Sequence, residues 1–153
     1  MTYTGVGATV KHARIILDSY KKWTGKNLLD GVDGFCDEFD RLFHAPFAVL
    51  SHGTEADPVL NFGNQTVLKL WEMDWETFTR TPSRMTAEPM LREERDRLLK
   101  EVSEKGFVEP FTGIRISSTG RRFYIVNATV WNLVDEFGAF CGQAAAFREH
   151  RYV

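Results

Sequence analysis

The sequence predicts an α+β domain in which helices cover an antiparallel sheet, and three observations support this. Phe47 to Leu50 is a continuous apolar run, which is typical of a strand buried on both sides. Arg122 to Val134 reads as a long strand whose two faces are both largely apolar. Residues 86–105 carry apolar side chains at helical spacing among many charged ones.

The composition limits the classes of function. At 153 residues the chain has the length of one domain, which can bury ~70% of its unfolded surface without cross-links. With 19 basic and 21 acidic residues and no long block of one sign, we expect no binding to nucleic acid. The 12 Phe and 4 Trp predict an aromatic core or a cavity lined with rings.

Three features bear on the location of the chain. No apolar run approaches the ~20 residues that span a bilayer. Met1 to Val10 lacks the basic start and the apolar stretch of a signal peptide. Cys36 and Cys141 are too few for a disulfide framework. We therefore expect a cytoplasmic protein with reduced thiols and no contact with a membrane.

Two amphipathic helices are predicted at the start of the chain. Thr9 can cap a helix that runs to about Trp23, and Gly25 lies just past its end. A second helical pattern, from about Asp33 to Phe43, ends before Pro46. Neither helix has a core of its own, so we expect both to pack on the domain or on a second copy of it.

A strand, a polar turn, a second strand and a helix follow. The turn between His52 and Pro58 breaks any regular element after the first strand. Residues 59–62 can pair back antiparallel, and Asn64 is a good N-cap for the next helix. A helical turn at residues 74–79 and a loop at 81–89 lead to the charged helix that begins at about Thr86. We expect its charged side to be a solvated outer face.

The remainder of the chain is predicted to be β-structure. Gly106 ends the charged helix, residues 114–116 alternate as a strand does, and the long strand at 122–134 is followed by a last strand at 140–147. Because both faces of the long strand are apolar, both sides of the sheet need cover.

Several stretches carry a resemblance to a known family. They are APFAVLSHGTEADPVLNFGN and LWEM within residues 45–73, SRMTAEP at 83–89, GIRIS at 113–117 and ATVWNLVDEFGAFCGQAAAF at 128–147. From about Leu17 to Phe147 the chain resembles the free-standing bacterial members of the MEKHLA domain family, which are PAS-like, although the string that named the family is absent. The resemblance implies a PAS-like sheet of five antiparallel strands with helices on one face. We place an N-terminal helical extension at residues 1–44 and the PAS-like domain at 45–150.

PAS domains as a class sense small ligands, light, oxygen or redox state through a bound cofactor, or serve as dimerising modules. The resemblance therefore implies a sensory or small-ligand-binding module, without an output domain in this chain, that signals by contact with another protein. We also expect a homodimer, because the N-terminal helices and the long strand both need cover. Two alternatives stay open: a homodimerising scaffold with a filled core, and a small enzyme that uses the cavity between sheet and helices.

Metal and haem chemistry find little support in the sequence. His52, Glu55 and Asp57 gather in one turn, but a metal site needs three or four convergent ligands and no second cluster of His or Cys follows. We assign no catalytic residue, although His52 or Glu55 would be the base in the enzyme alternative. Haem-binding PAS domains usually ligate through a histidine in the helical segment, and residues 64–106 contain none.

A non-covalent flavin or another small planar metabolite is the cofactor class that stays open. Rings can stack on such a ligand and polar groups can bind its edges. The candidate residues are Trp71, Trp75, Trp131, Asn127, Gln143 and His52. They could equally be core aromatics and satisfied polar groups of the sheet. Counting by two along the long strand puts Trp131 on the face of Asn127, so we expect Trp71 and Trp131 to wall one cavity between the sheet and the helices at 64–78.

Overall fold

The computed structural model describes residues 3–30, 32 and 37–153. Its strands form one antiparallel sheet in the order β2-β1-β5-β4-β3, and β6 pairs with β4 beyond the end of β5. The strands are β1 (Ala48–His52), β2 (Leu60–Gly63), β3 (Phe107–Ile116), β4 (Arg122–Val134), β5 (Phe140–Phe147) and β6 (Glu149–Tyr152). The predicted α+β antiparallel fold is confirmed, with six strands in place of five.

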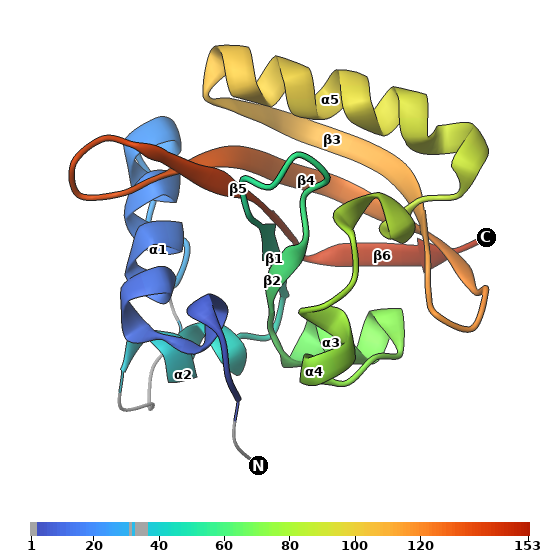
Figure 1. Ribbon diagram of the computed structural model, residues 1–153, viewed down its shortest axis with the longest axis horizontal. Coiled ribbons are helices and arrows are strands. Elements are labelled where there is room, and N and C mark those ends of the chain that lie inside the picture. Colours follow the sequence, from blue (N-terminus) through green and yellow to red (C-terminus); the bar gives the residue numbers. More distant parts are fainter. Residues whose placement is uncertain (1–2, 31, 33–36) are drawn as a thin grey trace.

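The helices lie on both faces of this sheet. They are α1 (Val10–Thr24), α2 (Glu38–Phe43), α3 (Gln65–Trp71), α4 (Trp75–Phe78) and α5 (Arg92–Lys105), with 3-10 turns η1 (Val6–Ala8), η2 (Ser83–Thr86) and η3 (Pro89–Leu91). Figure 1 shows α5 running along β3 and α1 standing beside the β4–β5 hairpin. Within the described ranges, no helix is long and apolar enough to cross a membrane.

Caps set the helix ends that the sequence predicted. At the start of α1, the Thr9 side chain accepts a hydrogen bond from the backbone N–H of His12 at 3.1 Å. Gly25 ends α1 in the left-handed conformation, with φ at 75°. At the start of α3, the Asn64 side chain accepts from the backbone N–H of Val67 at 3.2 Å.

One helix begins later than predicted, and the predicted start of another lies outside the described residues. α5 starts at Arg92 because residues 83–91 are taken up by η2 and η3, and Pro89, which has no backbone N–H, opens the second of these turns. α2 starts at Glu38, with Asp37 as its cap. The predicted first turn of that helix, residues 33–36, lies outside the described residues.

The second face of the sheet is covered within the same chain. α1 packs on β4, where the indole Nε1 of Trp131 donates to the carbonyl of Ile16 at 3.3 Å. The ring of Trp131 also meets that of Tyr20 edge-on, with centroids 5.0 Å apart. Nearby, Trp23 Nε1 donates to the carbonyl of Asn132 at 2.9 Å. α1 thus supplies the cover that a doubly apolar strand requires.

A bulge divides β4 into two halves with opposite alternation. Gly113 of β3 pairs with Ile125, and Phe111 of β3 pairs with Ala128, so three steps along β4 match two along β3. Asn127 sits in this stretch with φ at 53°, a left-handed conformation that Asn tolerates better than most residues.

Because of the bulge, Trp131 lies on the opposite face of the sheet from the one predicted. Before it, Phe123 faces the helices at 64–78 and packs edge-on against Trp71, with ring centroids 5.0 Å apart. After it, Trp131 faces α1 on the other side of the sheet. Counting by two through Asn127 was therefore wrong, and Trp71 and Trp131 do not share a cavity.

Candidate functional site

A cavity of about 70 Å³ lies between the sheet and the segment that runs from η2 to α5, on the face opposite α1. Its wall is mostly apolar and includes Trp71, Leu98, Phe111 and Val130. The polar residues that line it are Ser51, His52, Ser83, Thr86, Arg95, Arg115 and Gln143. α5 forms the roof. The sequence predicted only a solvated surface for its charged residues, yet the Arg95 side chain is 6% exposed.

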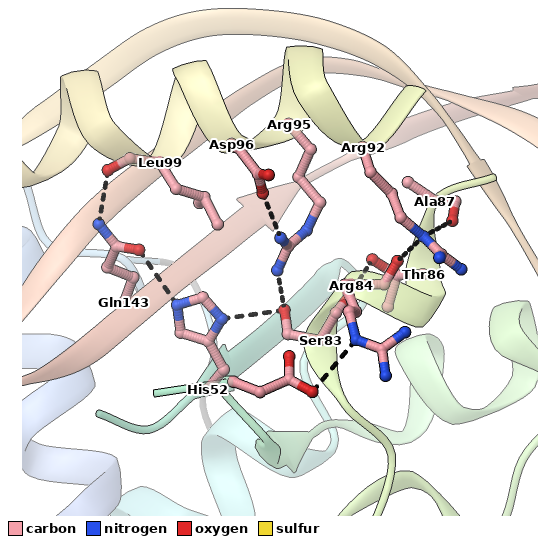
Figure 2. Close-up of polar contacts among 11 residues, drawn as sticks. His52, Ser83, Arg84, Thr86, Ala87, Arg92, Arg95, Asp96, Leu99 and Gln143 are labelled. Carbon is pink, nitrogen blue, oxygen red and sulfur yellow. Dashed lines mark hydrogen bonds and ion pairs between the residues drawn. The ribbon is translucent and has the colours of Figure 1, made fainter. Parts of the chain in front are cut away.

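Four elements bring the polar groups together, as Figure 2 shows. His52 ends β1, and its Nδ1 lies 2.9 Å from the hydroxyl of Ser83 in η2. The other ring nitrogen, Nε2, lies 3.1 Å from the side-chain oxygen of Gln143 in β5. Arg95 of α5 donates to the same Ser83 hydroxyl at 2.5 Å.

The partners of Gln143 fix the direction of these bonds. Its amide nitrogen donates to the carbonyl of Leu99 at 3.0 Å and to the side-chain oxygen of Asn132 at 3.1 Å, so its oxygen faces His52. His52 therefore carries its proton on Nε2 and accepts at Nδ1 from Ser83. Both nitrogens of the neutral imidazole are therefore hydrogen-bonded.

Burial keeps His52 neutral. The pKa of the imidazole is lowered to about 4, mainly by burial; the hydrogen bond to Gln143 opposes this shift, and the nearby charge of Arg95 adds to it. At pH 7 the ring is uncharged. This agrees with the tautomer that its hydrogen-bond partners require.

The hydrogen-bond network extends to α5 and so attaches the helix that covers the cavity to the sheet. Asn132 of β4 donates from its side-chain nitrogen to the carbonyls of Val102 at 3.0 Å and Ser103 at 3.3 Å. Gln143 reaches the carbonyl of Leu99 one turn earlier. The predicted polar residue Gln143 thus lines the cavity, but its oxygen and nitrogen are bonded to the protein.

Two arginines stand at the rim of the cavity. Arg95 lies 3.3 Å from the carboxylate of Asp96, whose side chain is 70% exposed. Arg115, half-buried on β3, donates to the carbonyl of Ile114 at 2.8 Å and lies over the ring of Phe111, 5.6 Å from its centroid. Burial, with the charge of Arg95 as a second cause, lowers the pKa of Arg115 to about 10, so the group stays charged at pH 7.

The same two arginines also line a pocket of about 180 Å³ on the outer side, between the start of α5 and β3. Glu94 and Tyr124 are among its other lining residues. Arg95 and Arg115 therefore line both the inner apolar cavity and this outer pocket.

Trp71 adds a polar group without a partner. Its ring packs against Phe123 and Phe147 and lines the cavity. Among the described residues no acceptor lies within hydrogen-bond distance of its buried Nε1. An unsatisfied buried N–H costs ~1–3 kcal/mol, so this nitrogen is a donor that lacks an acceptor in the folded chain as described.

The six predicted site residues do not form one site. His52, Trp71 and Gln143 line the cavity. Trp75 packs among Tyr3, Phe39, Phe43 and Phe62, and its Nε1 donates to the carbonyl of Thr4. Trp131 faces α1, and Asn127 is exposed at the bulge.

The turn that follows β1 is held by its own acidic residues. Glu55 accepts from the backbone N–H of Val59 at 3.2 Å, and Asp57 pairs with Arg84 at 3.1 Å. Both acids are exposed and neither lines the cavity. Over the described part of the chain, no group of three or more His, Cys, Asp and Glu side chains could hold a metal ion.

Sequence reasoning missed Ser83, Arg95 and Arg115. Arg95 did leave a signal, because it follows Leu91 by four residues and precedes Leu98 by three, which places it within the apolar stripe of its helix. Ser83 opens the SRMTAEP stretch. Arg115 lies between two isoleucines and gives no comparable signal.

A flavin does not fit this cavity. Pockets that enclose drug-sized ligands measure ~300–1,000 Å³, several times the space found here. Trp75, Trp131 and Asn127, three of the groups expected to bind such a ring, also lie elsewhere. A ligand of this site must be smaller.

The fold has known counterparts. The PAS domain of a protein from Colwellia psychrerythraea is 13% identical with a TM-score of 0.62, over 74% of this chain and 92% of that one. A light-oxygen-voltage domain studied with a flavin analogue is 14% identical with a TM-score of 0.59, over 75% and 83%. An RNA-binding light-oxygen-voltage receptor is 12% identical with a TM-score of 0.59, over 71% of this chain and 30% of that one.

At these identities the structural matches establish the fold alone, which is that of PAS and light-oxygen-voltage domains. No curated protein matches the chain. The family model of the MEKHLA domain matches residues 10–152, which include α1 and all six strands. The chain therefore belongs to the MEKHLA domain family.

Proposed function

We propose that this chain is a sensory module that binds a small ligand in the cavity beneath α5 and passes the signal on by contact with another protein. The observation that carries the proposal is the cavity itself, because an apolar space with a few buried polar groups is the usual form of a small-molecule site. The filled-core scaffold stays the alternative, because it predicts only that no cavity of ~300 Å³ or more is present. A cavity of about 70 Å³ favours a ligand smaller than a flavin.

The hydrogen-bond network supplies a route from the cavity to the surface. Arg95, Leu99 and Val102 of α5 all take part in it, together with His52 and Gln143 of the sheet. A ligand that draws Arg95 away from Ser83 changes the partners of His52 and therefore the hold on α5. Ligand binding can in this way alter the helix that a partner protein would contact.

The enzyme alternative is weaker. Ser83, His52 and Gln143 do form a chain of hydroxyl, imidazole and orienting amide, the arrangement by which a nucleophile is activated. Burial lowers the pKa of His52 to about 4, which makes it a poor base at neutral pH. The neutral Gln143 also offers no charge to stabilise an imidazolium, and the Ser83 oxygen is already bound by Arg95.

A thermal-shift screen of small metabolites tests the proposal. The variant Ala145→Leu fills the cavity from β5, since Ala145 lines it and pairs with Leu50 and Val130. Ala139→Leu, at an exposed position of the β4–β5 hairpin, is the matched control. A ligand at ~100 times its dissociation constant should stabilise the wild type and the control by ~2.7 kcal/mol and Ala145→Leu much less. Failure of every compound in a broad library would favour the filled-core scaffold.

We also propose a homodimer as the form in which the signal is passed on, and a cytoplasmic location on the basis of cysteine usage. α1 covers the sheet within one chain, so the support for a dimer now comes from the β4–β5 hairpin. There Phe137 is 86% exposed and Phe140 is 50% exposed. Light scattering should give twice the monomer mass for the wild type and the monomer mass for Phe137→Ser. A monomeric wild type would exclude the dimer.

A further inference from the structure

We propose that the ligand is a short aliphatic monocarboxylate, whose carboxylate is bound by Arg95 and Arg115 and whose hydrocarbon part fills the apolar cavity. The inference rests on the proposed function and names the chemical class of its ligand. It follows from the charges at the rim, from the hydrogen-bond donors without acceptors, and from the size of the inner space.

The charge at the cavity is positive. Arg95 and Arg115 both line it, whereas no Asp or Glu is among the described residues of its wall. The ion pair of Arg95 is to Asp96, which is mostly exposed, and no carboxylate in the described ranges lies within ion-pair distance of Arg115. Glu94 lines only the outer pocket. Two guanidinium groups at the edge of an apolar space favour an anionic group between them.

The site also has hydrogen-bond donors without partners among the described residues, whereas its hydrogen-bond acceptors are already bonded. A guanidinium carries five N–H donors in a planar fork that fits a carboxylate. The described partners of Arg95 are Ser83 and Asp96, and that of Arg115 is the carbonyl of Ile114. Trp71 Nε1 has no acceptor among the described residues. The oxygen of Gln143, in contrast, is already bound by His52. A ligand group that only accepts hydrogen bonds, as a carboxylate does, matches this set.

Gly113 makes room for the arginine on β3. Phe111 and Arg115 line the cavity, and Gly113, which lies between them at alternate positions along the strand, lines the outer pocket with both. A Cβ on Gly113 would come 2.7 Å from the ring of Phe111 and 3.4 Å from Nη1 of Arg115. The absence of a side chain there lets the guanidinium lie over the ring at the rim.

The inner space sets the length of the hydrocarbon part. One water needs ~10–15 Å³ of such space, so about 70 Å³ admits roughly five non-hydrogen atoms. Its wall is formed by Leu50, Leu98 and Val130 among others. A chain of about four to six carbons, with its carboxylate at the rim, therefore fits better than acetate or a long fatty acid.

Isothermal titration at pH 7.5 with butyrate, isovalerate, butyramide and inorganic phosphate tests this. We expect the two carboxylates to bind the wild type, and the neutral amide and phosphate to bind at least tenfold more weakly. Arg115→Gln should lose at least tenfold in carboxylate affinity. Arg97→Gln, which removes a charge from the exposed side of α5, should bind as the wild type does. Circular dichroism and the thermal midpoint check that each variant is folded.

Each other outcome overturns the proposal at a defined point. Equal binding of butyramide, or unchanged affinity in a folded Arg115→Gln, excludes recognition by the arginines and leaves the proposed cavity intact. Phosphate binding as tight as that of butyrate marks an anion patch without an apolar pocket. Carboxylate binding that survives Ala145→Leu places the site elsewhere. If no carboxylate binds but the metabolite screen finds another ligand, the carboxylate class fails while the sensory function stands.

Discussion

At the scale of single residues, the two buried histidines link stability to pH. His12 of α1 lies 3.0 Å from the hydroxyl of Ser51, and His52 is held by Ser83 and Gln143 on the other face. Burial lowers the pKa of each ring from 6.5 to about 4. The unfolded chain therefore binds more protons than the folded one between these values, and stability is lost as pH falls through that window.

From this we expect the free energy of unfolding to fall by ~2 kcal/mol per histidine between pH 7.5 and pH 5. Urea unfolding at the two pH values measures the change. His12→Asn and His52→Gln should each remove part of the dependence, because an amide does not titrate. A free energy that stays level between pH 7.5 and pH 5 would mean that the histidines are solvated in the folded state.

Asn64 makes more hydrogen bonds than a helix cap alone requires. It is fully buried, and its oxygen accepts from the backbone N–H groups of Val67 and Val49 at 3.2 Å each. Its nitrogen donates to the carbonyls of Leu42 at 3.1 Å and Phe47 at 2.7 Å. One side chain thus ties together the end of α2, β1 and the start of α3.

Asn64→Ala should consequently cost more than the ~0.5–2 kcal/mol of an ordinary cap, because buried partners are left without a bond. We expect a loss of ~3 kcal/mol or more in urea unfolding. Thr9→Ala, which removes the exposed cap of α1, is the matched comparison and should stay within the ordinary range. Equal losses for the two variants would show that the extra bonds of Asn64 contribute nothing.

At the scale of elements, the bulge in β4 decides which side chains reach the cavity. With φ at 53°, Asn127 holds a conformation that Gly also adopts freely and that β-branched residues resist. We expect Asn127→Gly to be nearly neutral and Asn127→Val to lower the free energy of unfolding by ~1–2 kcal/mol. Urea unfolding of the pair separates strain from loss of the amide. Similar losses in both variants would point to the side chain and away from the backbone.

The bulge also shows which parts of the structure could be predicted from the sequence. The ends of β4 were predictable, because turn residues at 118–121 and 135–138 bracket an apolar strand. The shift of alternation at Asn127 was not, because a single Asn, although uncommon in strands, does not by itself distinguish a bulge from a regular strand. Of the residues that line the cavity, His52, Trp71 and Gln143 could be predicted from the sequence, because they are polar or aromatic side chains in or next to predicted strands and a predicted helix. Arg95 and Arg115 were missed because isolated charges are usually solvated.

At the scale of the whole molecule, β1 separates two polar networks that meet different helices. Ser51 faces His12 and α1, and the next residue, His52, faces Ser83 and the cavity beneath α5. Breaking one network should loosen one helix. For His52→Leu we expect faster amide hydrogen exchange in α5 than in α1, and for Ser51→Ala the reverse. Mass-spectrometric exchange on both variants tests this, and equal effects on the two helices would show that the faces are not separate.

The short strand β6 has a consequence for how the chain behaves in solution. Its backbone pairs with residues 123–126 of β4, and Arg121 lies over the ring of Tyr152, 3.4 Å from its centroid. A fragment that lacks residues 149–153 would leave that stretch of β4 open to water. Open strand edges pair readily with strands of other molecules, so such a fragment should aggregate even though it keeps the whole cavity. We therefore expect the four residues of β6, which are all exposed and include Glu149 and Arg151, to protect the protein from self-assembly into a continuous sheet.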